Sequence, residues 1–198
     1  MPHDYEVLHS ERVYDGRVIA LRRDEVSMPG ETSSVRDVVE HPGAVAVVAL
    51  DEQERVVLVR QYRHPVRRPL DELPAGILDV DGEPAQETAK RELAEEAGLA
   101  ADTWHVLVDL LTSPGMSDEA ARIYLARDLR EVERDVQLHE EAEMTSSRVF
   151  LATLVAGVLA GEYENALLVA GVLAADRAVR VGFVGLRPAD APWPARHR

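Results

Sequence analysis

The sequence predicts a mixed α+β domain built in layers, and three observations lead to this fold class. Short alternating runs fill residues 5–40, two strongly apolar runs follow between residues 44 and 63, and helical patterns interrupt the later strands. The helical patterns do not follow every strand, so the regular strand–helix alternation of a parallel α/β sheet is absent and a mixed layered architecture is favoured. At 198 residues we expect one main domain with room for a small extra layer.

The N-terminal region predicts a small antiparallel sheet. Its runs lie at residues 6–8, 17–22 and 34–39, and Pro29-Gly30 supplies the geometry of a tight turn between the last two. Composition changes near residue 41, where we place a boundary. The predicted divisions are an N-terminal β-sheet segment (1–42), a main domain (43–186) and an extended tail (187–198) that contains three prolines.

The main domain begins with its most apolar run. Residues 44–50 are apolar on both faces, which is typical of a buried central strand. Residues 56–63 predict a second strand paired to the first across the polar turn 51–54, and residues 70–75 predict a short third strand that closes at Gly76. Further strands are expected at 104–111, 122–126 and 147–150, with helices near 152–159 and 165–179.

Residues 84–97 have helical character. Pro84 suits a first helical position, Gly98 suits the terminating position, and the apolar residues Ala89, Leu93 and Ala97 recur at four-residue spacing. The apolar stripe is narrow, and acidic and basic residues crowd the opposite side.

Charge and composition exclude several classes of protein. There are 36 acidic residues against 22 Lys and Arg, a net charge of −14, which disfavours a nucleic-acid binder because phosphate affinity comes from basic side chains. The absence of cysteine excludes disulfides, Cys-ligated zinc and thiol nucleophiles, so a metal must be bound by oxygen or imidazole. The chain opens with acids, and no apolar run reaches the length of a bilayer span. We therefore expect a cytoplasmic protein without a membrane segment.

The predicted helix carries three acids on one side. Glu92 and Glu96 are four residues apart and Glu95 lies between them, so their carboxylates project from neighbouring positions. Like charges at this spacing oppose helix formation by roughly 0.2–0.5 kcal/mol per pair. A hard divalent cation with oxygen ligands would compensate. The alternative is an acidic face that only contacts water.

With its flanking glycines, this helix resembles the signature of the Nudix hydrolases, G-x5-E-x7-R-E-U-x-E-E-x-G-U, where U is a bulky aliphatic residue. The nine matching positions are Gly76, Glu83, Arg91, Glu92, Leu93, Glu95, Glu96, Gly98 and Leu99. One departure is visible, since six residues (77–82) separate Gly76 from Glu83 where the signature has five. The resemblance implies the Nudix fold, a mixed β-sheet sandwiched between α-helices, with a loop–helix–loop that presents glutamates to Mg²⁺ or Mn²⁺.

The resemblance also assigns roles within the signature. It implies that Glu92 and Glu96 are catalytic metal ligands, that Glu95 is a further ligand, and that the backbone carbonyl of Ala75 lies nearby as a fourth. In such enzymes water cuts a nucleoside diphosphate linked to another group within its pyrophosphate.

Similarity reaches beyond the signature to nearly the whole chain and points to the ADP-ribose pyrophosphatase branch. Residues 61–63, 72–76, 113–119 and 139–143 carry it. The implied reaction is Mg²⁺-dependent hydrolysis of ADP-ribose to AMP and ribose 5-phosphate. Three alternatives stay open: a pyrophosphatase for another nucleoside-diphosphate sugar, a non-catalytic ADP-ribose sensor, and an interaction protein in which the acidic helix is only structural.

The resemblance implies contacts to the substrate as well. It places Arg63 near the phosphates, where a guanidinium fork fits phosphate oxygens, and Glu72 either near the metal site or beside an arginine. Pro114, sixteen residues after Gly98, matches a proline associated with ADP-ribose specificity. The binding residues implied there are Pro114, Gly115 and Met116; an ordinary Pro-Gly turn is the alternative.

The general base and the dimer are likewise implied by the resemblance. Glu141 is favoured as the base that deprotonates or orients the attacking water, with Glu140 and Glu143 as alternatives. Relatives in this branch are homodimers in which the N-terminal sheet of one subunit reaches the other and helps to form the adenosine pocket. Residues 5–40 fit that role because so small a sheet is marginal alone.

Overall fold

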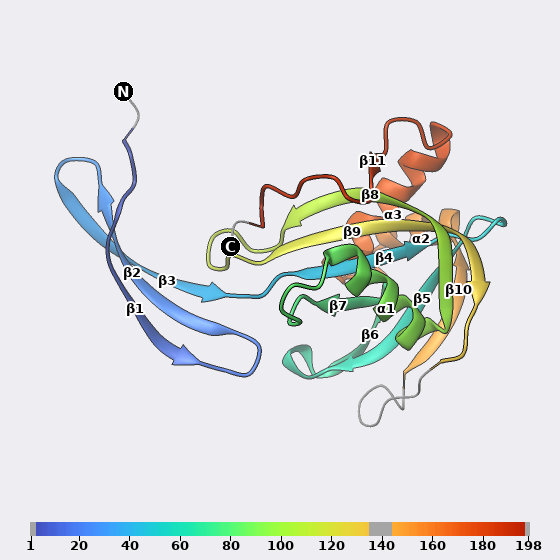
Figure 1. The fold of residues 1–198 in the computed structure, drawn as a ribbon, viewed down its shortest axis with the longest axis horizontal. Coiled ribbons are helices and arrows are strands. Elements are labelled where there is room, and N and C mark those ends of the chain that lie inside the picture. Colours follow the sequence, from blue (N-terminus) through green and yellow to red (C-terminus); the bar gives the residue numbers. More distant parts are fainter. Residues whose placement is uncertain (1–2, 135–143, 197–198) are drawn as a thin grey trace.

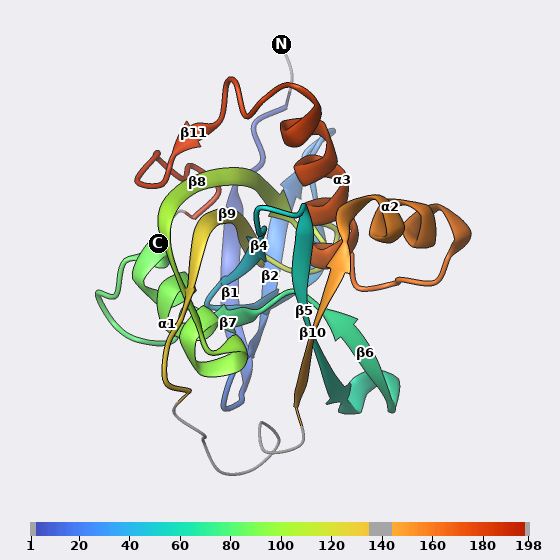
Figure 2. The same ribbon diagram turned by 90° about the vertical axis from the view of Figure 1, so that its right-hand side faces the viewer.

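The computed structural model describes residues 3–134 and 144–196. A five-stranded mixed sheet lies at the centre, a three-stranded sheet lies beside it, and a separate three-stranded sheet is formed by the N-terminal strands (Figures 1 and 2). The strands are β1 (Val7–Asp15), β2 (Ala20–Met28), β3 (Thr32–Glu40), β4 (Ala44–Ala49), β5 (Arg55–Arg63), β6 (Arg68–Glu72), β7 (Ala75–Ile77), β8 (Leu99–Leu111), β9 (Ala120–Glu131), β10 (Thr145–Phe150) and β11 (Arg187–Pro188). The helices are α1 (Ala85–Ala97), α2 (Leu151–Ala160) and α3 (Ala166–Arg180), with a short 3₁₀ turn η1 (His64–Val66).

The N-terminal sheet has the predicted antiparallel form, in the order β1-β2-β3. A turn at Pro29-Gly30 joins β2 to β3, and Gly30 has φ +82°, a conformation that glycine adopts without strain. The sheet projects away from the rest of the molecule (Figure 1). The chain passes from this sheet into the main domain between β3 and β4.

The central sheet has the order β11-β8-β9-β4-β7, and β4 runs parallel to β9. Every residue of β4 is buried, as its apolar sequence predicts. Ala46 and Val48 pack into a core with Leu168 and Val172 of α3, whereas Val45 and Val47 pack into a second core with Leu93 of α1. Because successive side chains of a strand point to opposite faces, one strand serves both cores and the sheet is sandwiched between helices, as expected.

The predicted hairpin between the strands at 44–50 and 56–63 is wrong. β5 pairs with β10 and β6 in the second sheet, and a single bridge, Leu50 to Val56, links it to the end of β4. The two edges of β4 are already occupied by β9 and β7. Between the strands the Asp51 carboxylate accepts the N–H of Arg55 at 2.8 Å, which fixes a turn that carries the chain from one sheet to the other.

The predicted single strand at residues 70–75 is also wrong, because the chain divides it into β6 and β7. These strands belong to different sheets, and Leu73-Pro74 separates them. Pro74 has no N–H to donate to a ladder, while its carbonyl accepts the N–H of Val47 at 2.8 Å. The proline therefore marks the point at which the chain crosses between sheets.

The tail packs on the central sheet through a buried arginine. Arg122 of β9 is 3% exposed, donates to Asp109 of β8 at 2.7 Å and to the carbonyl of Ala191 at 2.8 Å, and lies over the ring of Trp193. Burial opposes ionisation of Asp109, but hydrogen bonds from Arg122 and Arg187 outweigh it and hold the pKa of this carboxyl below its usual value. The predicted domain boundaries, after residue 42 and after residue 186, stay predictions.

In the part of the chain that the structure describes, none of the helices combines the length and apolar character needed to cross a bilayer.

Candidate active site

Helix α1 has well-defined ends and presents its acids to β7. Pro84 is the N-cap, one position before the first helical residue that it was predicted to fill. Gly98 ends the helix in the left-handed conformation at φ +65°, which a glycine tolerates. Ala89 and Leu93 are fully buried against β4, so the acidic side of the helix turns toward the edge of the sheet at β7.

Two consecutive residues of β7 contact two of the acids. The Ala75 N–H donates to Glu96 Oε2 at 2.9 Å, and Glu96 is 6% exposed. A Cβ placed on Gly76 would lie 2.2 Å from Glu92 Oε1, so only a glycine allows this close approach. The structure thus brings together Ala75, Glu92 and Glu96, three of the residues that the sequence proposes as metal ligands.

Arg91 connects the remaining acids. Its Nη1 lies 2.8 Å from Glu92 Oε1 and 3.1 Å from Glu95 Oε2, and its Nη2 lies 3.3 Å from Glu83 Oε2. The Thr88 hydroxyl also donates to Glu83 at 2.8 Å. Hydrogen bonds from Arg91 and Thr88 lower the pKa of Glu83. Burial disfavours the charged form of Arg91, but the Glu83 hydrogen bond and the attraction of the three carboxylates outweigh burial and raise the pKa of Arg91.

The Arg91 guanidinium therefore offsets part of the repulsion between the carboxylates of this helix. Within residues 3–134 and 144–196, no three His, Asp or Glu side chains converge as a ready metal cage. The donors of this cluster are all oxygens, the ligand type that Mg²⁺ and Mn²⁺ prefer. The close packing of Gly76 on Glu92 leaves the carboxylate end of that side chain beside the β7 backbone. These features fit a hard divalent cation.

Glu72, at the end of β6, forms a second cluster. It is 3% exposed and accepts hydrogen bonds from Arg63 Nη2 at 2.6 Å, from Gln61 Nε2 at 3.2 Å and from Asn165 Nδ2 at 3.0 Å. The sequence left open whether Glu72 lies near the metal site or beside an arginine, and the structure shows the contact with Arg63. Asn165 was not among the predicted site residues, although an Asn directly before an apolar helical run is a recognisable N-cap signal.

The loop with Pro114, Gly115 and Met116 lies between β8 and β9 and is exposed. The Val39 N–H of β3 donates to the Met116 carbonyl at 2.8 Å, and the Asp118 N–H donates back to the Val39 carbonyl at 3.1 Å. The loop is thereby joined to the end of the N-terminal sheet.

Comparison with known proteins agrees with this geometry. Residues 40–165 match the NUDIX domain, and this stretch contains all nine signature positions. The chain belongs to the Nudix family.

Curated relatives of this Nudix chain include an ADP-ribose pyrophosphatase of Mycobacterium tuberculosis, 53% identical over 191 residues, which cover 96% of this chain and 92% of the relative. A methanol dehydrogenase activator of Bacillus methanolicus is 39% identical over 136 residues, 69% of this chain and 73% of the relative. A solved structure described as an ADP compounds hydrolase superposes with a TM-score of 0.76 at 22% identity and covers 92% of this chain and 98% of its own. At that identity the superposition supports the fold alone.

The predicted general base of the Nudix site, Glu141, lies outside the described residues, as do its alternatives Glu140 and Glu143. Its role stays a prediction.

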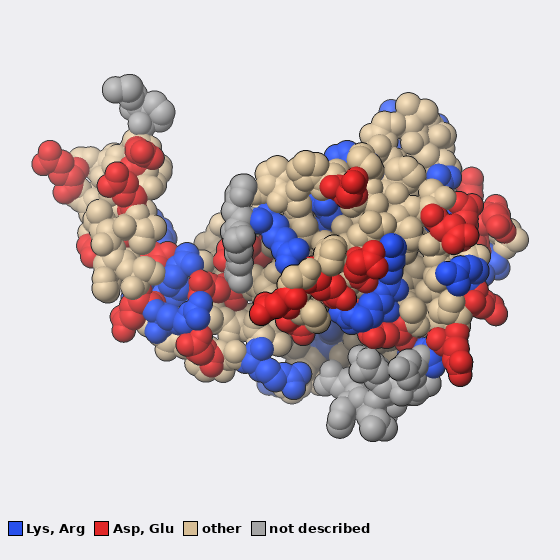
Figure 3. Space-filling view, in the orientation of Figure 1, with Lys and Arg blue, Asp and Glu red and all other residues tan. Residues whose placement is uncertain are grey.

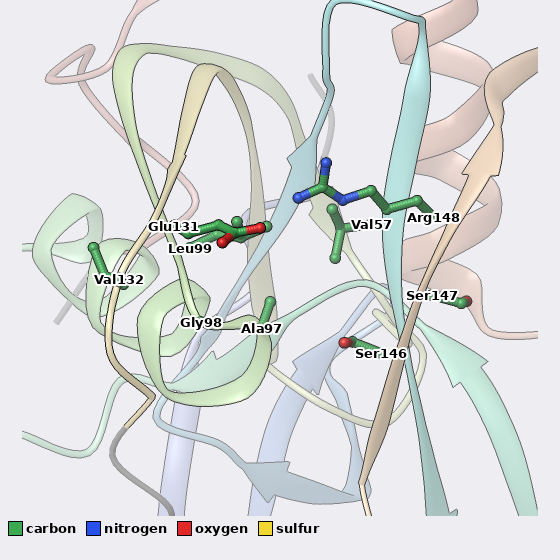
Figure 4. Close-up of a pocket in the computed structure, with 9 residues that line it drawn as sticks. All are labelled: Val57, Ala97, Gly98, Leu99, Glu131, Val132, Ser146, Ser147 and Arg148. Atoms are coloured by element: carbon green, nitrogen blue, oxygen red, sulfur yellow. The ribbon is translucent and has the colours of Figure 1, made fainter.

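A cavity of about 330 Å³ opens beyond the C-terminal end of the Nudix helix α1 (Figure 4). Its lining residues are Val57, Ala97, Gly98, Leu99, Glu131, Val132, Ser146, Ser147 and Arg148. Among the described residues, none of the predicted ligands or substrate contacts lines this cavity, although the signature positions Gly98 and Leu99 do.

Proposed function

We propose that this Nudix protein hydrolyses ADP-ribose to AMP and ribose 5-phosphate with Mg²⁺ as the cofactor, which Mn²⁺ can replace. The observation that carries the proposal is the identity of more than half of the residues, over almost the whole chain, with an ADP-ribose pyrophosphatase. The nine signature residues are present, and two of those on α1, Glu92 and Glu96, contact β7.

Glu92, Glu95 and Glu96 and the carbonyl of Ala75 would hold the ion. When bound, it would offset the negative charge of the diphosphate and make its phosphorus more electrophilic toward water. Its charge matters in a chain of net charge −14, which otherwise repels an anionic substrate. Over the region of α1, acidic and basic side chains lie side by side (Figure 3). Arg91 contacts Glu92 and Glu95, two of the acids that would hold the ion.

The chain's own residues would divide the remaining work. The guanidinium of Arg63, which the Glu72 carboxylate holds, would contact the phosphates. The loop with Pro114, Gly115 and Met116 would contact the rest of the nucleotide sugar. Glu141 would take a proton from the water that attacks one phosphorus, while the bond from that phosphorus to the bridging oxygen breaks.

We also propose that the protein is a homodimer joined through its N-terminal sheet. Large apolar side chains on this sheet face solvent, among them Leu8 at 56%, Tyr14 at 59% and Val35 at 57% exposure. A projecting three-stranded sheet with such side chains is marginal alone, and a second copy would cover it. A cytoplasmic location stays a prediction.

Light scattering tests the dimer. Leu8→Asp together with Val35→Asp should convert a dimer to a monomer, whereas Leu159→Asp, at an apolar and even more exposed position of α2, should leave it a dimer. A monomeric wild-type protein at working concentration would contradict the proposal.

The activity is tested with a panel of nucleoside-diphosphate sugars, with and without Mg²⁺, followed by chromatography of the products. We expect AMP and ribose 5-phosphate from ADP-ribose at the highest kcat/KM of the panel. A preference for a sugar nucleotide without adenine would refute the proposed substrate, and binding without turnover would favour a sensor. The panel is needed because the Bacillus methanolicus relative carries a different description. Hydrolysis in ¹⁸O-labelled water then identifies the phosphorus that is attacked.

A further inference from the structure

The Glu72 cluster depends on donors from two parts of the chain. Gln61 and Arg63 are two residues apart on β5, so their side chains lie on one face of that strand, together with Val59, the cross-strand partner of Glu72. Sheet register therefore places these two donors next to the carboxylate. Asn165 is 93 residues away in sequence and reaches Glu72 only because α3 packs on this region.

Asn165 makes two different hydrogen bonds with one amide. Its Oδ1 accepts the Leu168 N–H at 3.0 Å and so caps α3, while its Nδ2 donates to Glu72 Oε1 at 3.0 Å. A backbone N–H only donates and an ionised carboxylate only accepts, so these partners leave the amide a single orientation. The start of α3 and the buried carboxylate are thereby held to each other.

Neighbouring contacts join the same two elements. Glu164, next to Asn165, forms an ion pair with Arg68 at the start of β6. A Cβ placed on Gly171 of α3 would lie 2.8 Å from the Leu73 side chain, directly after Glu72. Helix α3 therefore packs directly beside the end of β6, the exposed ion pair adds little, and Asn165 links this packed region to the Glu72 carboxylate.

We propose that Asn165 is a positioning residue for ADP-ribose, because it fixes Glu72 and Glu72 fixes the Arg63 guanidinium for the diphosphate. The inference rests on the proposed function and on the role of Arg63 in it. The Arg63 side chain is 43% exposed whereas that of Glu72 is 4% exposed, so substrate can reach the guanidinium while its support stays covered. An arginine that is already held loses less conformational freedom when it binds a phosphate.

Two substitutions separate this role from capping. Asn165→Ser keeps a capping hydroxyl and removes the donor to Glu72. Asn165→Asp keeps an equally good cap and sets a second carboxylate against Glu72. We expect each variant to raise the KM for ADP-ribose about tenfold, the usual scale for a lost hydrogen bond to a charged group, with kcat changed less than about twofold. Glu164→Gln removes only the exposed ion pair with Arg68 and leaves the Asn165 hydrogen bonds and the packing of Gly171 on Leu73 in place, so it should leave both constants unchanged.

A double-mutant cycle shows whether the effect passes through Arg63. In an Arg63→Gln background, Asn165→Ser should raise the KM no further, because the group that Asn165 positions is gone. The proposal is overturned by an unchanged KM in the folded Asn165→Ser and Asn165→Asp variants. It is also overturned by equal effects of Asn165→Ser in both backgrounds, or by an unchanged KM in Arg63→Gln itself.

A binding measurement separates this inference from the proposed reaction. The probe is α,β-methylene ADP-ribose, whose bridge water cannot cut, and its Kd should rise about tenfold in Asn165→Ser. If wild-type protein binds the probe with this dependence but does not hydrolyse ADP-ribose, the proposed activity fails and the positioning role stands. If the wild type hydrolyses ADP-ribose and the Kd is the same in both proteins, the positioning role fails alone. A wild type that neither binds nor hydrolyses overturns both.

Discussion

Replacing Gly76 with alanine should separate activity from stability. The new Cβ would lie 2.2 Å from Glu92 Oε1, 2.3 Å from its Cδ and 2.5 Å from its Cγ. Non-bonded heavy atoms keep about 3.5 Å apart, so the Glu92 carboxylate must move by roughly 1 Å or more. The obstructed atoms are the end of a side chain, and the main chain can stay in place.

The expected magnitudes differ widely. Overpacking of this kind costs about 1–3 kcal/mol, or about 2–12 °C in Tm for a chain of this size, so Gly76→Ala should still fold. Misplacing a group of the site by about 1 Å can lower turnover about 100-fold. We therefore expect a folded variant with a kcat for ADP-ribose about two orders of magnitude below that of the wild type.

The assay measures Mg²⁺-dependent AMP release at saturating ADP-ribose, together with thermal unfolding. Gly185→Ala is the matched control. Gly185 has φ +84° and no neighbour within 4 Å of a Cβ, so alanine there costs about 1–2 kcal/mol of strain without contact to Glu92. It should lower the Tm to a similar extent and leave kcat unchanged. A Gly76→Ala enzyme that keeps more than about a third of wild-type kcat would refute the reasoning.

Three further predictions concern the same fold. Glu96→Gln should abolish hydrolysis while the Tm stays within a few degrees, because the amide oxygen can still accept the Ala75 N–H; retained turnover would contradict its role as a metal ligand. Asp109→Asn should lower the free energy of unfolding most at neutral pH. The lowered pKa of Asp109 gives stability that is present above its unfolded value near 4 and is lost as pH falls through the folded value, so urea titrations of variant and wild type should converge in acid. A constant difference from pH 7 to pH 3 would count against this. Ending the chain at Leu186 removes two carbonyls that accept from buried Arg122 and should lower the Tm by several degrees, whereas an unchanged Tm would show that the tail does not stabilise the sheet.

Elements with a local cause were predictable from the sequence. Helix α1 depends on a four-residue apolar spacing, a proline at its start and a glycine at its end, all within one short segment. The strong burial of β4 follows from its own apolar residues. The signature is local as well, and residues three and four apart on a helix are neighbours in any helix, so the grouping of Glu92, Glu95 and Glu96 was fixed in advance.

Strand partners depend on distant parts of the chain. The apolar runs at β4 and β5 are compatible with a hairpin, but the parallel neighbour of β4 is β9, more than 70 residues later, and only the packing of both sheets selects that pairing. The division between β6 and β7 at Pro74 has the same origin, because β6 pairs with β5 in one sheet and β7 pairs with β4 in the other.

The sequence by itself determined the acidic helix, its glycine neighbours and the family chemistry that they imply. The tertiary structure decided that Glu96 reaches the Ala75 N–H, that Glu72 is buried beneath Arg63, and that Asn165 reaches both α3 and Glu72. The physical reason is that helix periodicity is set by neighbouring residues, whereas a buried charge finds its partners only when distant segments close around it and exclude water.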